Sequence, residues 1–430
     1  MNPQALELNQ IIAQNNANVL EMLSDRGKNI FFPKKGILGQ TAEARGTAIN
    51  ATIGSAIEDD GSPMRLDAIA SKVDLDPSLI FPYAPSFGRP DLRTIWKNKI
   101  YEKNISLGKN KISLPVVTSA LTHAVSIAGY LFADQGEEII VPGLFWGNYT
   151  LILTNAWGAG LRKFKLFKDG KIDIEAFEES LNSGKPGKKI LLLNFPNNPS
   201  GYTPSVEEAE AIVSAIKSSA EKGNKIVAII DDAYFGLVYE DGISKESIFA
   251  PLSNIHENVL AVKIDGPTKE DYVWGLRVGF ITFGIKGGNA GLYNALEAKT
   301  AGAIRGNISN ASNLSQSLLV AGYSSSNYLL QKEAKYNIMR QRFKAVKDAL
   351  KNPEYHKYFT PLPFNSGYFM CIKLAEGLNG EAVRQVLIKN YSIGTISLDN
   401  LLRIAYSAVS AKDIPILFES IYKACIDTIQ

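Results

Sequence analysis

The chain has 430 residues, of which 45% are hydrophobic and 21% are charged. These values are typical of folded globular proteins, and a chain of this length buries a sizeable core without disulfides or a metal. The composition excludes an intrinsically disordered protein, a collagen and a small disulfide scaffold. With 46 basic and 43 acidic residues the formal net charge is only +3, so we expect no basic surface for nucleic acid.

Cysteine and histidine are too few and too scattered for a metal site. Cys371 and Cys425 form no CxxC pair, and the three histidines have no cysteine close to them in sequence. We therefore expect free thiols in a reducing compartment and no bound metal. The N-terminus lacks the basic and apolar regions of a signal peptide, and no apolar run approaches the roughly 18 residues of a membrane helix. The sequence thus predicts a cytoplasmic protein that does not bind membranes.

The first 65 residues are predicted to form an arm. Apolar residues recur at helical spacing between residues 2 and 25, which indicates an amphipathic helix. Residues 28–63 are rich in Gly and Pro and show few periodic runs. We expect residues 1–65 to be an ordered arm that completes part of a small domain.

Short apolar strands alternate with helical segments in the middle of the chain. Strands are expected at residues 138–141, 189–195, 225–231, 259–264 and 278–283. Helical segments lie between them, at 121–134, 205–222 and 292–300. Near-continuous apolar strands that alternate with helices predict an α/β fold, in which helices cover both faces of a parallel sheet. We expect this large domain to span residues 66–326.

The pattern changes after about residue 326. A long helix is predicted at residues 328–350. Shorter elements follow it, with strands at 367–374 and 402–406 and helices at 380–389 and 414–429. Residues 327–430 are therefore expected to form a smaller α+β domain.

Polar motifs follow three of the predicted strands at the points where the strands end. An Asn-Pro-Ser-Gly turn occupies residues 198–201, Asp231 and Tyr234 follow the next strand, and Lys269 follows the third, eight residues before Arg277. Each motif alone is weak, because turns, helix caps and solvated lysines are common. Ligands of open α/β sheets gather at the carboxyl ends of the strands. The order and position of the motifs therefore predict one shared site.

These three motifs, in this order, resemble the pyridoxal-phosphate-dependent aminotransferases of fold type I, class I/II, and among them the aspartate and aromatic aminotransferases. The resemblance extends over residues 50–407. It implies a large domain whose mostly parallel seven-stranded sheet is covered by helices, beside a smaller α+β domain. It also implies pyridoxal 5'-phosphate as the cofactor, small-molecule amino acid and 2-oxo acid substrates, and a homodimer with composite active sites.

The resemblance assigns the central chemistry to three residues. Lys269 binds the cofactor aldehyde covalently and, once released, moves the proton from the amino-acid Cα. Asp231 keeps the pyridine nitrogen protonated, and Tyr234 hydrogen-bonds the phenolic oxygen of the ring. Asp232 alternates with Asp231 along the strand, so we expect it to point away and Asp232→Ala to change turnover little.

Further positions match cofactor-binding residues of the family. Trp146 is expected to stack on the ring, and Asn198 to hydrogen-bond its phenolic oxygen. Tyr83 is expected to reach the phosphate from the neighbouring subunit. The remaining phosphate-binding positions are Leu121, Thr122, Thr268 and Arg277.

The phosphate-binding segments depart from the family pattern at two places. Gly266 stands where the family often has a serine, three residues before the lysine. The phosphate loop reads Ala120-Leu121-Thr122, where the family often has Ser-Gly-Thr or Gly-Ala-Thr. Two side-chain hydroxyls for the phosphate are therefore missing, and the sequence leaves open how the phosphate is held.

The resemblance also implies substrate-binding residues. Gly54 and Asn198 are expected to contact substrate, and Arg403 offers two parallel hydrogen bonds to the α-carboxylate. Arg305 begins an R-x-N-x-S-N segment similar to that of aspartate and aromatic aminotransferases, in which the arginine crosses the dimer to the distal carboxylate. The two prolines that usually follow this segment are absent, since residues 311–312 are Ala and Ser.

The leading hypothesis is an aminotransferase that moves an amino group from an amino acid to a 2-oxo acid by a ping-pong mechanism. Aspartate, glutamate, aromatic amino acids or both classes are the expected substrates. A β-lyase or decarboxylase of the same fold is the alternative, because the strand-end motifs are nearly the same. A cofactor-sensing regulator would carry a DNA-binding module first, and the first 50 residues are too few and insufficiently basic for one.

Overall fold

The computed structural model describes residues 1–33 and 36–429. The predicted arm, residues 1–65, includes Lys34 and Lys35, and the predicted last domain includes Gln430; these three residues lie outside the described part. The predicted division at residues 65 and 326 stays a prediction.

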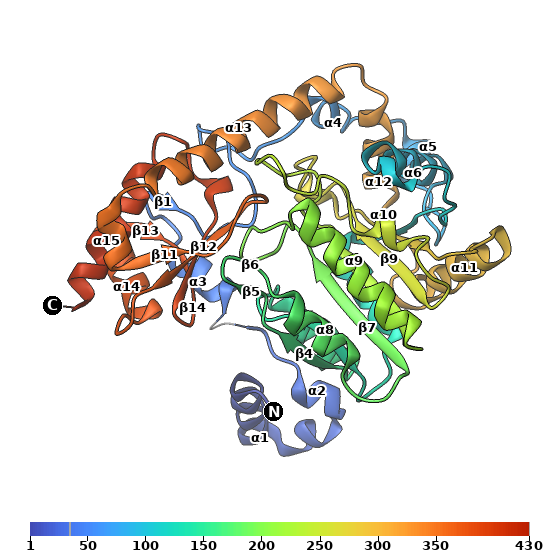
Figure 1. Cartoon of the computed structure of the whole chain (residues 1–430), viewed down its shortest axis with the longest axis horizontal. Coiled ribbons are helices and arrows are strands. Elements are labelled where there is room, and N and C mark those ends of the chain that lie inside the picture. The colour runs from blue at the N-terminus through green and yellow to red at the C-terminus, as the bar shows by residue number, and fades with distance from the viewer. Residues whose placement is uncertain (34–35, 430) are drawn as a thin grey trace.

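A mostly parallel sheet of seven strands forms the centre of the described structure (Figure 1). Only β10 runs antiparallel to its neighbours β9 and β2. The predicted fold class is therefore confirmed. In spatial order the strands are β2 (Val116–Thr118), β10 (Gly279–Gly284), β9 (Val259–Asp265), β8 (Lys225–Asp231), β7 (Lys188–Asn194), β3 (Glu138–Pro142) and β4 (Gly160–Phe164).

Both faces of the sheet are buried. Successive side chains of a strand point to opposite faces, so each strand contributes to the core on either side. In β7, Leu191 and Leu193 belong to one apolar core, and Leu192 belongs to the other. The first core is completed by α9 (Val206–Glu221), which begins at the capping box that Ser205 forms with Glu208. The second is covered by α7 (Ala120–Phe132) and α11 (Ala290–Asn307).

Two strands of the sheet carry too little sequence signal to be predicted. β2 is only three residues long. β4 lies at the edge of the sheet, and its sequence Gly-Leu-Arg-Lys-Phe is half-exposed over most of its length. Periodicity needs a longer alternating or apolar run to stand out from a loop.

A second, antiparallel sheet of four strands lies in the C-terminal part, where the sequence predicts the smaller domain. The N-terminal segment joins this part of the molecule: β1 (Ile49–Asn50) pairs in parallel with β13 (Ile393–Gly394). α13 (Tyr328–Ala349) runs from the side of the large sheet to that of the small one (Figure 1). The other elements of this part are β11 (Phe359–Pro361), β12 (Met370–Leu374), β15 (Leu401–Ile404), β14 (Ile396–Leu398), α14 (Gly380–Tyr391) and α15 (Ile414–Ile429).

The N-terminal helix is present, as α1 (Pro3–Met22). No helix within residues 1–33 and 36–429 is long and apolar enough to cross a membrane. In the same part of the chain, no three His, Cys, Asp or Glu side chains gather as metal ligands. Cys371 and Cys425 are buried free thiols.

Candidate active site

A cavity of about 370 Å³ lies where β7 and β8 end and where the chain leaves β9. Its walls also include the first turn of α7, the segment after β1, and β15. Most of the residues expected to bind cofactor or substrate line this cavity. They are Gly54, Leu121, Thr122, Trp146, Asn198, Asp231, Tyr234, Thr268, Lys269, Arg277 and Arg403.

Asp231 is a buried carboxylate at the end of β8. Its Oδ2 accepts a hydrogen bond from the Tyr149 hydroxyl at 2.5 Å, and its Oδ1 accepts one from the Ala233 N–H at 3.1 Å. Burial raises the pKa of Asp231 to about 6, although both hydrogen bonds oppose the shift. A buried carboxylate of this kind gains most from a cationic partner, which would restore its ionised form.

Asn194, the last residue of β7, joins two of the strand-end motifs. Its amide donates to the Asp231 carbonyl oxygen, and its side-chain oxygen accepts from the Asn198 N–H, both at 2.8 Å. Asn198 and Tyr234 both line the cavity. Burial raises the pKa of the Tyr234 phenol, so this hydroxyl remains a hydrogen-bond donor at neutral pH.

Lys269 follows β9 and extends its amine into the cavity. Its Nζ donates to the Gly54 carbonyl oxygen at 2.8 Å, and it lies 5.2 Å from the centre of the Tyr234 ring. Burial, followed by the positive charges of Arg403 and Arg277, lowers the pKa of Lys269 to about 7, and the negative charge of Asp231 opposes this shift. At neutral pH a large share of this amine is therefore unprotonated and able to act as a nucleophile or a base.

One of the two departures from the family pattern, the glycine at position 266, has a packing explanation. At Gly266, an added Cβ would lie 2.9 Å from both the Leu121 Cδ1 and the Val278 carbonyl oxygen. At Gly279, it would lie 2.6 Å from the Ala120 carbonyl carbon. The first turn of α7 thus packs directly on these two glycines, and a serine at position 266 has no room. A remaining hydroxyl, Thr268 Oγ1, is buried with no hydrogen-bond partner among the described residues.

Arg403 presents a guanidinium group to the substrate side of the cavity. It is 3% exposed, its Nη2 donates to the Thr52 carbonyl oxygen at 3.0 Å, and its Cζ lies 4.4 Å from the centre of the Phe369 ring. Its Nε is buried without a partner in the described part of the chain. The glycine of the Asn-Pro-Ser-Gly turn packs against the backbone of Phe369: at Gly201 (φ +73°), a Cβ would lie 1.8 Å from the Phe369 carbonyl oxygen.

Tyr83 and Arg305 lie outside the set of residues that line the cavity. Tyr83 is 90% exposed. Arg305 is exposed in the last turn of α11, where its Nη1 donates to Ser309 Oγ at 2.9 Å. Both were expected to act across a dimer, so a single chain does not test their roles.

The structure adds site residues that sequence reasoning missed. Tyr149 follows Trp146 by three residues, and only the fold brings it to Asp231. Ile37 and Leu38, from α3 (Ile37–Glu43), line the cavity although they precede the first predicted strand by about a hundred residues. The arm prediction placed this segment near the small domain, but no motif in it indicated a contact with the site.

Asp232 has a structural role that the sequence did not indicate. It is buried and bonded to Lys263 Nζ, and it accepts a hydrogen bond from Ser247 Oγ at 2.6 Å. Lys263 is itself fully buried in β9, and Asp265 Oδ2 is 3.5 Å from its amine. Asp232 does not line the cavity, in contrast to Asp231.

Asp232→Ala should therefore lower the free energy of unfolding by about 3 kcal/mol or more, because it leaves a buried lysine with one distant partner. Denaturant unfolding measures this loss. Asp67→Ala is the control, since Asp67 is exposed and lies 3.8 Å from Arg65 in a surface pair worth about 1 kcal/mol at most. A loss for Asp232→Ala as small as that of the control would contradict the structural role.

Comparison with known proteins identifies the family of the chain. The family model described as "Aminotransferase class I and II" matches residues 58–421. A solved aminotransferase from Anaerococcus prevotii superposes with a TM-score of 0.83 at 25% identity, covering 94% of this chain and 98% of that one. The α-aminoadipate aminotransferase of Thermus thermophilus, solved with N-(5'-phosphopyridoxyl)-L-leucine, shares the fold with a TM-score of 0.75 at 17% identity, covering 95% of this chain and 98% of that one.

The chain belongs to the class I and II aminotransferase family, because the family model covers most of its length. Among curated relatives, the aspartate aminotransferase of Pinus pinaster is 26% identical over 200 residues, which are 46% of this chain and 38% of that protein. The chain matches about half the length, or less, of this and the next most similar curated relatives.

Proposed function

We propose that the protein is a pyridoxal-phosphate-dependent aminotransferase that moves an amino group from an amino acid to a 2-oxo acid by a ping-pong mechanism. The observation that carries the proposal is the meeting of Lys269, Asp231 and Arg403 in one cavity, with a lysine whose pKa is about 7. The family membership and the aminotransferase relatives named above favour this reaction over β-elimination or decarboxylation.

The donor set of the cavity fits the phosphate of pyridoxal phosphate. Thr268 Oγ1 is buried and unpartnered among the described residues. Arg277 and Thr122 line the same cavity, and Ser119 makes no side-chain cap on α7, whose first N–H groups have no acceptor within the helix. Backbone N–H groups at a helix N-terminus bind phosphate readily, so they would replace the hydroxyls that Gly266 and Ala120 lack.

The opposite end of the cavity fits a protonated pyridine ring. Asp231 would hold the ring nitrogen, since a cation there restores the ionised form of this buried carboxylate. Trp146 would stack on the ring, and Asn198 and Tyr234 would hydrogen-bond its phenolic oxygen. When bound, the cofactor supplies an electron sink for the pair left at the substrate Cα.

The remaining chemistry is the work of the chain's own residues. Arg403 binds the substrate α-carboxylate and so orients the Cα–H bond toward Lys269. The Lys269 amine would accept the proton that leaves the Cα and would pass it to the cofactor carbon that receives the amino group. Burial, together with the charges of Arg403 and Arg277, keeps this amine partly unprotonated at neutral pH, which suits both duties.

A half-reaction assay tests the proposed reaction. Adding an amino acid should shift the absorbance of the bound cofactor, and a 2-oxo acid added afterwards should restore it. A β-lyase would release pyruvate or ammonia, and a decarboxylase would release carbon dioxide, without needing a 2-oxo acid. Failure of every 2-oxo acid to restore the absorbance would contradict transamination.

We also propose a homodimer in the cytoplasm, in which Tyr83 reaches the phosphate of the neighbouring subunit. The nearly full exposure of Tyr83 in the single chain, at 90%, supports a role at an interface. Interfaces of obligate dimers usually bury more than about 2,000 Å². Sedimentation at assay concentrations should give twice the mass of one chain, and a fully active monomer would refute composite sites.

Arg305 tests which substrate side chains the site accepts. A distal carboxylate entering a water-poor site needs a cation, and its loss costs about 2–5 kcal/mol. Arg305→Ala should therefore lower kcat/KM for dicarboxylic amino acids by at least about 30-fold. Aromatic substrates should change much less.

Lys299→Ala is the matched control for Arg305, because Lys299 is an exposed cation on the same helix. It should leave both substrate classes unchanged. If the wild type has no activity on any dicarboxylic substrate, Arg305 has no such role. The apolar lining from Ile37, Leu38 and Phe369 would then favour apolar or aromatic side chains.

A further inference from the structure

Two acidic residues directly follow the lysine of the site. The side chains of Glu270 and Asp271 are only 6% and 1% exposed. Burying two neighbouring carboxylates is costly unless each is paired and hydrogen-bonded. Neither residue lines the cavity, so their partners have to explain why they are buried.

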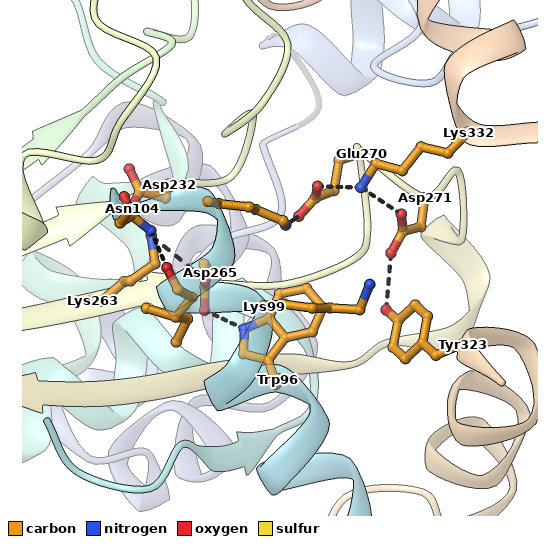
Figure 2. Close-up of polar contacts among 12 residues, drawn as sticks. Trp96, Lys99, Asn104, Asp232, Lys263, Asp265, Glu270, Asp271, Tyr323 and Lys332 are labelled. Atoms are coloured by element: carbon orange, nitrogen blue, oxygen red, sulfur yellow. Dashed lines mark hydrogen bonds and ion pairs between the residues drawn. The ribbon is translucent and has the colours of Figure 1, made fainter. Parts of the chain in front are cut away.

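Glu270 is held by two lysines from different helices. Its Oε1 accepts from Lys103 Nζ at 2.6 Å, at the end of α6 (Pro90–Lys103), and its Oε2 accepts from Lys332 Nζ at 2.5 Å, on α13. Figure 2 shows Lys332 between Glu270 and Asp271. Burial raises the pKa of Glu270, but the two lysines outweigh burial and lower it below its ordinary value, so the carboxylate is ionised.

Asp271 is held by side chains of α13 and of α12 (Asn313–Tyr323). Its Oδ1 accepts from the Tyr328 hydroxyl at 2.8 Å and lies 2.9 Å from Lys332 Nζ, and its Oδ2 accepts from the Tyr323 hydroxyl at 2.9 Å. Its backbone N–H donates to the Pro267 carbonyl oxygen at 2.9 Å. The two residues after Lys269 are thus anchored on side chains of three helices.

Helix α13, which carries Lys332, also contacts the part of the chain that carries Arg403. Arg342, ten residues after Lys332 on α13, donates from Nη1 to the Ser407 carbonyl oxygen at 2.5 Å and from Nη2 to Asp59 at 2.8 Å. Ser407 follows Arg403 by four residues. One helix therefore bonds both to the segment of Lys269 and to the segment of the arginine that lines the same cavity.

We propose that Glu270 is a positioning residue for Lys269, acting through its ion pairs with Lys103 and Lys332. The proposal rests on the proposed function, in which Lys269 binds the cofactor and moves the Cα proton. Glu270 fixes the backbone from which the Lys269 side chain extends, because its ion pair with Lys332 bonds this backbone segment to α13. Small displacements of a reacting group have large effects on rate, up to about 100-fold for 1 Å.

Glu270→Gln tests the proposal, with Glu297→Gln as the matched control. Glu297 is also buried, and it accepts from Arg93 Nη2 and from the Leu114 N–H, both at 2.8 Å, without lining the cavity. Both variants remove one buried charge with the same change of side chain. They differ in that only Glu270 adjoins Lys269.

We expect Glu270→Gln to lower kcat by roughly 10- to 100-fold with a much smaller change in KM. The pH midpoint of the absorbance of bound pyridoxal phosphate should also move, by about half a unit or more, because it depends on the distances from Lys269 to Arg403, Arg277 and Asp231. Glu297→Gln should lower the thermal midpoint of unfolding but leave kcat and the pH midpoint unchanged.

Lys332→Met and the double variant Glu270→Gln/Lys332→Met keep the test decisive if Glu270→Gln folds poorly. The double variant removes both members of the Glu270–Lys332 pair and also frees Lys103, so it should lose at least as much kcat as Lys332→Met alone. If the Glu270 variants match Glu297→Gln in kcat and in pH midpoint, the positioning role is wrong. If instead the wild type binds no pyridoxal phosphate at Lys269, the proposed function itself fails.

Discussion

Lys269→Ala should lower transamination by more than about 10,000-fold, the upper end of what a positioned general base contributes. The variant removes both the covalent link to the cofactor and the amine that accepts the Cα proton. The fold should survive, because within the described residues the Lys269 side chain makes one hydrogen bond, to the Gly54 carbonyl oxygen. The rate is measured with an amino acid and a 2-oxo acid at saturating pyridoxal phosphate.

Lys286→Ala is the control for this variant, since Lys286 is exposed and follows β10 at a distance from the cavity lining. It should retain full activity. The wild-type apoprotein should also take up pyridoxal phosphate faster as the pH rises through about 7, because only the neutral amine of Lys269 attacks the aldehyde. Activity of Lys269→Ala within tenfold of the wild type would contradict the assignment.

Asp231→Ala should lower turnover by about 1,000-fold. A buried carboxylate opposite the ring nitrogen stabilises charge that develops in the reaction, and losses of one such group reach about 100- to 1,000-fold. Asp173→Ala is the control, because Asp173 is another buried aspartate, at the start of α8 (Ile174–Asn182) and outside the cavity lining. Its loss costs a helix cap of about 1 kcal/mol.

The measurement for Asp231→Ala is kcat for the full reaction, together with the absorbance of the bound cofactor. The spectrum should report loss of the ring proton at a lower pH than in the wild type, since the anion that stabilises it is gone. Turnover within tenfold of the wild type, or an equal loss in Asp173→Ala, would overturn the role of Asp231.

The strand-end residues could be predicted because strong local patterns mark them. β8 has the predicted bounds, and Asp231 is its last residue, where an apolar run stops at a carboxylate. β7 is shifted by one residue at both ends relative to the predicted strand, and β9 is one residue longer at its end. Parallel strands bring their carboxyl ends to one edge, so sequence order alone placed these motifs together.

The supporting residues could not be predicted, because tertiary packing decides their environment. Lys263 lies inside an apolar strand, and nothing local shows that Asp232 and Asp265 surround its amine. Tyr149 follows an aromatic segment that would serve equally well as core. The serine expected at position 266 is absent for a steric reason, because the Val278 carbonyl oxygen and the Leu121 side chain fill the space beside Gly266, which is visible only in three dimensions.

Borohydride reduction followed by peptide mapping is the most direct test of Lys269 as the residue that binds the cofactor. The protein is loaded with pyridoxal phosphate, reduced and digested, and the labelled peptide is sequenced by mass spectrometry. We expect a single label on Lys269, and none after reduction of Lys269→Ala. A label on Lys263 or Lys286, or an unlabelled protein, would contradict the proposed site.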